Sequence, residues 1–259
     1  MRVKVFATAA DAAAAAARRL AAILRRPGGS VLLLPAGKTA APVYRDLVRL
    51  HRSGRAPFRK GTTTFNLDEL AVAPDDPRSF RSFMERHLFS KVDLDRGRIR
   101  FLRGDAADPD RECARYEREF RREGPPDVAF VGIGVNGHVA YLEPARSSLP
   151  PETSRVRLSE STRRGLAGDG VRPVPREAIT VGIETILSAR SVLMVAMGRR
   201  KAAAVTAALE GPVAPTCPAS FLSLHPRLTV LLDRGAASLL ASARRRSPPA
   251  RSSRRRASA

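Results

Sequence analysis

Tryptophan is absent from the 259 residues, and only three tyrosines and two cysteines are present. Cys113 and Cys217 lie far apart and match no metal-ligand spacing, so we expect neither a disulfide framework nor a metal site. Long apolar runs are also missing: the alanine run 12–17 is much shorter than the ~20 apolar residues of a membrane helix. We therefore expect a protein of a reducing compartment, the cytoplasm, without a membrane partner.

Acidic residues are scarce as well. Asp and Glu number 25 against 46 Lys and Arg, which gives a formal net charge of +21. Seven of these charges are arginines within the last 16 residues. Such clusters bind nucleic-acid phosphates nonspecifically, but no aromatic side chains are interleaved here, so we favour a solvated terminus over a nucleic-acid partner. The remaining +14 favours an anionic substrate or partner.

Short apolar runs alternate with amphipathic stretches along most of the chain. This alternation predicts an α/β fold, an open and mostly parallel doubly wound sheet of the Rossmann-like three-layer type, in a single domain over 1–240. A polar segment rich in Gly and Pro, about 147–175, is predicted to be a mobile lid, and 241–259 a basic disordered tail. The predicted strands are 3–6, 31–34, 63–67, 99–102, 128–131, 179–182, 192–197 and 230–233; the predicted helices are 11–26 with Asp11 near the N-cap, 42–52, 79–88, 109–123 and 201–209.

Ligands of such sheets bind outside the carboxyl ends of the strands. Four polar loops are therefore candidates for a site, namely those after Leu34, Leu67, Val131 and Met197. In the first loop, Gly37 lets backbone N–H groups turn toward an anion, and Lys38 and Thr39 can donate to phosphate. The G-x-x-x-x-G-K-[ST] pattern of nucleotide-binding loops is absent, and an ordinary strand-to-helix turn remains the alternative.

Two adjacent carboxylates, Asp68 and Glu69, follow the strand at 63–67. Neighbouring side chains point in different directions, so we expect only one to reach a substrate while the other accepts hydrogen bonds behind it. A carboxylate at the carboxyl end of a strand is well placed as a general base. A helix or turn cap is the competing interpretation.

The densest polar motif is Gly132 to Glu143, GIGVNGHVAYLE. Its first six residues match the dinucleotide pattern G-x-G-x-x-G, but a helix should then begin at once, and prolines follow instead. The alternative is a catalytic cluster of Asn136, His138 and Glu143, in which histidine moves protons and the carboxylate orients it.

These residues resemble a known family. FNLDEL at 65–70 is similar to the FNxDEY pattern of glucosamine-6-phosphate deaminases, and GIGVNGHVAYLEP at 132–144 resembles their GxGxxGHxxFNEP block. LPAGKT at 34–39 and MGRRKA at 197–202 resemble their phosphate-loop and LGxxKA elements. The related 6-phosphogluconolactonases share the fold but typically read GHTASLFP, without a glutamate at the position of Glu143.

The resemblance implies conversion of glucosamine 6-phosphate and water to fructose 6-phosphate and ammonia, with no cofactor and no metal. It implies that Asp68 moves the proton between C2 and C1 and that His138, assisted by Asn136 and Glu143, opens the sugar ring. Lys201 and the loop from Gly37 to Thr39 would bind the phosphate.

This sequence departs from the family at several positions. Lys38 stands where glycine or serine is usual, and Asn136 where some members have aspartate. The lid arginine of the family has no clear counterpart, and Arg163, Arg164 or Lys38 are the candidates to replace it. A lactonase-like hydrolase and a non-catalytic sugar-phosphate sensor remain alternative functions, and a homo-oligomer remains open.

Overall fold

A seven-stranded, all-parallel sheet forms the centre of the molecule in the computed structural model, which describes residues 1–58 and 61–241. The strand order is β1-β10-β9-β6-β2-β3-β5. The strands are β1 Arg2–Phe6, β2 Val31–Leu34, β3 Thr63–Asn66, β5 Ile99–Arg100, β6 Val128–Val131, β9 Val192–Ala196 and β10 Leu228–Asp233. The predicted open parallel sheet is thus confirmed.

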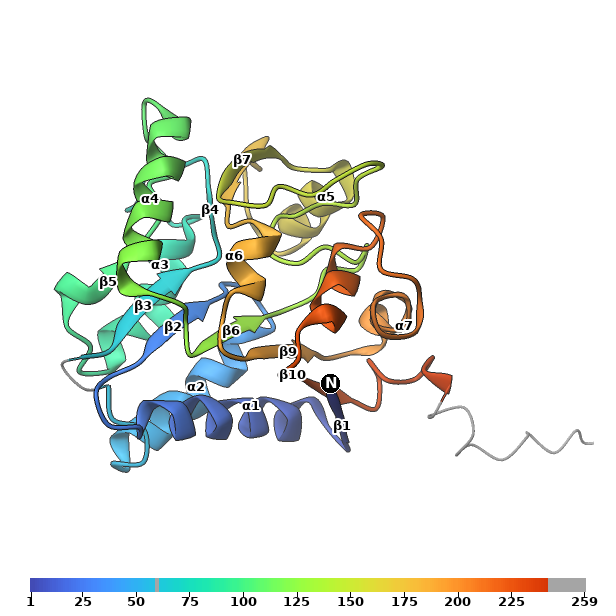
Figure 1. Cartoon of the computed structure of the whole chain (residues 1–259), viewed down its shortest axis with the longest axis horizontal. Coiled ribbons are helices and arrows are strands. Elements are labelled where there is room, and N and C mark those ends of the chain that lie inside the picture. Colours follow the sequence, from blue (N-terminus) through green and yellow to red (C-terminus); the bar gives the residue numbers. More distant parts are fainter. Residues whose placement is uncertain (59–60, 242–259) are drawn as a thin grey trace, which may run out of the picture.

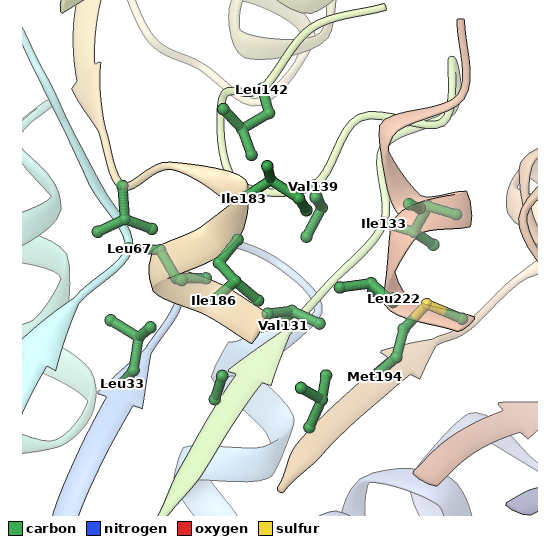
Figure 2. Packing of buried hydrophobic residues seen from close by; sticks show 14 of the residues in the cluster. Leu33, Leu67, Val131, Ile133, Val139, Leu142, Ile183, Ile186, Met194 and Leu222 are labelled. Carbon is green, nitrogen blue, oxygen red and sulfur yellow. The ribbon is translucent and has the colours of Figure 1, made fainter. Parts of the chain in front are cut away.

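Helices cover both faces of this sheet (Figure 1). Alternation along β2 shows why: Leu32 and Leu34 pack with α1 and α2, whereas Leu33 points to the opposite face, where α4 lies. In Figure 2, Ile183 and Ile186 of α6 lie close to Val131 of β6 in this second layer. The helices are α1 Ala9–Leu24, α2 Ala40–Arg52, α3 Phe80–His87, α4 Pro109–Glu123, α5 Glu160–Gly168, α6 Ile183–Leu187 and α7 Ala202–Glu210, with short 3₁₀ turns η1 Phe89–Lys91, η2 Arg96–Arg98, η3 Arg199–Lys201 and η4 Pro218–Leu224.

A second, three-stranded antiparallel sheet was not predicted. It has the order β4-β8-β7, with β4 Asp68–Leu70, β7 Ser154–Arg157 and β8 Glu177–Thr180. The polar segment 147–175, predicted as a lid, contains β7 and α5. The sequence pattern does not show which sheet these strands join. The strands are short, and their pairing partners are distant along the chain. The mobility of this lid stays a prediction.

Several helix boundaries differ from the prediction by one or two residues, and the first helix begins two residues earlier than predicted. The N-cap of α1 is Thr8, whose hydroxyl accepts a 3.1 Å hydrogen bond from the Asp11 backbone N–H, while Asp11 accepts one from that hydroxyl at 2.7 Å. Asp11 is therefore the third residue of the helix; its N–H is capped by Thr8 as in a capping box, but its carboxylate accepts from the Thr8 hydroxyl and not from the Thr8 backbone N–H. The strand predicted at 99–102 is also shorter, only Ile99–Arg100.

No helix in residues 1–58 and 61–241 is long and apolar enough to cross a membrane. The basic tail predicted from residue 241 lies, beyond Ala241, outside the described residues.

Candidate active site

A cavity of about 1810 Å³ opens at the carboxyl ends of β2, β3, β6 and β9, the contiguous middle of the sheet. The four predicted loops meet here, as expected for parallel strands. All sequence-predicted site residues except Glu143 line this cavity, namely Gly37, Lys38, Thr39, Asp68, Asn136, His138 and Lys201. Arginines from several elements add positive charge to the wall and favour an anionic ligand: Arg45, Arg86, Arg164, Arg172, Arg199 and Arg200.

Glu69 is the anchoring member of the carboxylate pair. Its oxygens accept hydrogen bonds from the Ser79 hydroxyl at 2.8 Å and from the backbone N–H groups of Phe80 at 2.7 Å and Arg81 at 2.9 Å. These donors form the N-terminus of α3, where a carboxylate is favoured. Glu69 thus fixes β4 against α3, and the prediction of one anchoring carboxylate and one free one matches this geometry.

Asp68 is the free member. Its residue is only 7 % exposed, yet it lines the cavity, and no group in the described part of the chain donates a hydrogen bond to its carboxylate. Burial, and secondarily the charge of Glu69, raises the pKa of Asp68 to about 8. A buried carboxyl without partners, titrating near neutral pH and open to a ligand cavity, has the properties of a general base.

Gly134 of the 132–137 motif leaves room for the His138 ring. A Cβ added at Gly134 would lie 2.4 Å from the His138 ring, and Gly134 N–H donates to the His138 carbonyl at 2.8 Å. No helix begins between Gly137 and β7, so the helix N-terminus that a dinucleotide would need is missing. The dinucleotide interpretation does not fit this loop.

Behind His138 lies a hydrogen-bonded cluster around Glu143. Asn136 Nδ2 donates to Glu143 Oε2 at 2.9 Å, and its Oδ1 accepts from the His138 backbone N–H at 3.2 Å. His138 Nδ1 lies 3.7 Å from Glu143 Oε2 and 3.3 Å from the Thr162 hydroxyl. Glu143 does not line the cavity and contacts His138 from outside it. The asparagine is apt at this position because an amide can donate to the carboxylate.

The charge of Glu143 is strongly stabilised. Burial alone would raise the pKa of Glu143. Contacts with His138, Thr162 and Asn136 outweigh burial and lower this pKa to about 2. Glu143 is therefore ionised at every working pH, while Asp68 titrates near 8. Two carboxyls with such separated pKa values are suited to different tasks.

Sequence reasoning missed the contribution of α5. Ser161 accepts from Asn136 Nδ2 at 3.2 Å, Thr162 contacts His138, and the Ser159 backbone N–H donates to Glu143 at 3.3 Å. The available signal was Ser159 itself, a serine N-cap ahead of an acidic first turn. No local pattern predicts that this helix packs against the 132–143 loop.

One end of the cavity combines the β2–α2 loop with η3. Gly37 has φ +110°, a conformation that glycine adopts readily, and Thr39 precedes α2 with its side chain free of any capping hydrogen bond. Burial, with the nearby Arg200, lowers the pKa of Lys201. Lys38 does not simply point to solvent: its Nζ lies 2.6 Å from Asp169 Oδ1, just after α5.

The proposed substitutes for a lid arginine are placed differently. Arg164 lines the cavity and pairs with Glu160 at 2.8 Å, whereas Arg163 is not among the lining residues. Arg172, which the sequence analysis did not consider, also lines the cavity.

Comparison with known proteins places this geometry in a family. The family described as "Glucosamine-6-phosphate isomerases/6-phosphogluconolactonase" matches residues 5–231. The chain belongs to this family. The chain is 43% identical over 213 residues to glucosamine-6-phosphate deaminase 1 of Giardia intestinalis, covering 80% of this chain and 78% of the relative. It is 37% identical over 246 residues to glucosamine-6-phosphate deaminase of Cellvibrio japonicus, covering 93% and 92%.

Solved structures of the glucosamine-6-phosphate isomerase/6-phosphogluconolactonase family agree with the fold. A structure described as a monomeric glucosamine-6-phosphate deaminase superposes with a TM-score of 0.87 at 38% identity, covering 92% of this chain and 100% of that one. A 6-phosphogluconolactonase from Trypanosoma brucei superposes with a TM-score of 0.71 at 21% identity, covering 93% and 98%, and this likeness concerns the fold alone.

Within this family, Asn136 offers a direct test of the cluster. Asn136→Asp would place a second carboxylate against Glu143, and like charges raise the pKa of one member by about a unit or more. We expect the pKa of Glu143 to rise clearly from its value of about 2, measured by carboxyl-carbon NMR titration. Asn136→Ala, which removes the donor without adding charge, should give a smaller rise. An unchanged titration in the Asp variant would contradict the cluster.

Proposed function

We propose that this chain is a glucosamine-6-phosphate deaminase, converting glucosamine 6-phosphate and water to fructose 6-phosphate and ammonia. The observation that carries the proposal is the pairing of His138 with an ionised Glu143 at the cavity that also contains the unpartnered Asp68. The deaminase relatives, matched over most of their length, support the same activity.

Ring opening is the first task we assign. The C1 hydroxyl of the cyclic sugar loses its proton while the ring oxygen gains one, and His138 can move protons in both directions. Glu143 fixes the imidazole, and Thr162 contacts the same Nδ1 atom. The opposite ring nitrogen is then available to the sugar.

Isomerisation is the second task. Asp68, as carboxylate, takes the proton from C2 of the open-chain sugar while a proton of the substrate's ammonium group passes to the C1 carbonyl oxygen, which gives an enolamine with a hydroxyl at C1. Asp68 then returns its proton to C1, and the nitrogen lone pair forms the iminium at C2. Water adds to C2, and ammonia leaves, which yields the ketose. In that addition the iminium nitrogen accepts the electron pair and one water proton, the second water proton is released as the C2 carbonyl forms, and Asp68 is again a carboxylate.

The direct experiment follows ammonia and fructose 6-phosphate together after adding glucosamine 6-phosphate to the purified chain. Equal amounts of both products are expected. Hydrolysis of 6-phosphogluconolactone without ammonia release would favour the lactonase alternative, against which the Glu143–His138 contact argues. Sugar-phosphate binding with neither reaction would favour a sensor.

Lys201 provides the test of phosphate recognition. A charged hydrogen bond lost from a phosphate costs roughly 1.5–3 kcal/mol, about ten- to a hundredfold in affinity. Lys201→Ala should therefore weaken the affinity for glucose 6-phosphate, measured by calorimetry, by that factor. The affinity for glucose should stay unchanged. Equal losses for the phosphorylated and unphosphorylated sugars, on folded protein, would refute the phosphate role.

A further inference from the structure

Asp169 lies where an anion would be expected to bind. Its Oδ1 is 2.6 Å from Lys38 Nζ, a charge-assisted hydrogen-bond distance, and both residues line the cavity. Lys38 extends from the β2–α2 loop, next to Gly37 and the start of α2. A carboxylate oxygen at this point has the charge and acceptor chemistry of a phosphate oxygen.

The second lysine of the proposed phosphate subsite senses the same carboxylate. The pKa of Lys201 is lowered by burial and by Arg200, and the charge of Asp169 acts in the opposite direction. Asp169 thus interacts with both lysines that we assign to the phosphate, one by direct contact and one through its field.

The Asp169 carboxylate is weakly held and can move away from Lys38. The Lys38 and Asp169 side chains are 71% and 45% exposed, and exposed ion pairs contribute only about 0.2–1 kcal/mol. Gly168 and Gly170 flank Asp169, and a Cβ added to either would meet no atom within 4 Å. At its other end α5 is held through Ser161 and Thr162 against Asn136 and His138. The Asp169 carboxylate is therefore weakly held, whereas the helix that precedes it is fixed beside Asn136 and His138.

We propose that Asp169 is an affinity-setting residue that competes with the substrate phosphate for Lys38 and Lys201. Its carboxylate occupies the subsite in the free protein, and the dianionic phosphate of the sugar displaces it. The inference rests on the proposed phosphate subsite and extends it to Asp169, the residue that directly follows α5 and that no sequence motif singles out.

Calorimetry with inorganic phosphate and glucose 6-phosphate tests this without turnover. Asp169→Asn should lower the Kd of both ligands roughly two- to fivefold, which is the effect of removing an exposed ion pair. The Kd of glucose should stay unchanged. Asp105→Asn is the matched control, because Asp105 is exposed and makes no side-chain hydrogen bond or ion pair among the described residues, so this variant removes the same charge elsewhere. Unchanged or weaker phosphate binding in Asp169→Asn would overturn the proposal.

A double-mutant cycle separates occupancy of the subsite from a general field effect. If Asp169 competes through Lys38, the gain from Asp169→Asn should shrink clearly in a Lys38→Met background. A gain of the same size in both backgrounds would show that Asp169 only lowers the local potential, and would refute the competitor role. Ammonia release is measured separately: tighter phosphate binding without deamination would contradict the proposed function and leave this inference supported.

Discussion

Asp68→Asn should lose at least about a hundredfold in kcat while glucose 6-phosphate binding stays close to that of the wild type, because an amide cannot accept the C2 proton. With deuterium at C2 of glucosamine 6-phosphate, the residual reaction should show a full primary isotope effect, since proton abstraction becomes the slow step. In the wild type, kcat/KM should rise with pH up to about 8 as the carboxyl ionises. Deamination near the wild-type rate in this variant would refute the base assignment.

The same substitution should stabilise the fold at alkaline pH. The pKa of Asp68 is about 8 in the folded state against an ordinary 3.8, so the folded protein binds more protons than the unfolded chain between these values. Wild-type stability therefore falls as pH rises through this window, and the asparagine variant avoids that loss. We expect a higher Tm for Asp68→Asn at pH 8 and no difference below pH 4, with Asp105→Asn as control. A lower Tm at pH 8 would show that the carboxylate is stabilised in the fold.

His138→Gln should produce a loss of comparable size, about 10²- to 10⁴-fold in kcat, for a different reason. Glutamine keeps a polar group near Glu143 and Thr162 but cannot shuttle protons between the ring oxygen and the C1 hydroxyl. Ring opening should then limit the reaction, so the isotope effect from deuterium at C2 should fall toward unity, opposite to Asp68→Asn. The two variants thus separate the two steps.

His87→Gln is the matched control, since His87 lies on α3, packs against the Phe83 ring and does not itself line the cavity. It should retain normal kinetics. A large C2 isotope effect in His138→Gln would mean that proton abstraction still limits the rate, and the ring-opening role would be wrong.

Part of the site could be predicted because its signals are local. Strands end at Leu34, Asn66 and Val131 where the apolar runs stop, and the polar residues that follow are positioned by the parallel sheet itself. The division of labour between Asp68 and Glu69 also follows from side-chain alternation, although only the α3 N-terminus identifies Glu69 as the anchor.

What the sequence by itself determined is the succession of the central sheet's strands and of helices α1 to α4 and α7 along the chain, and the identity of the polar loops, because these depend on residues close together in the chain. Tertiary structure alone decided that β4, β7 and β8 form a separate antiparallel sheet, that α5 supports His138, and that Lys38 pairs with Asp169. These contacts join residues far apart in the sequence. Their free energies are small individually and depend on burial and geometry that no local pattern encodes.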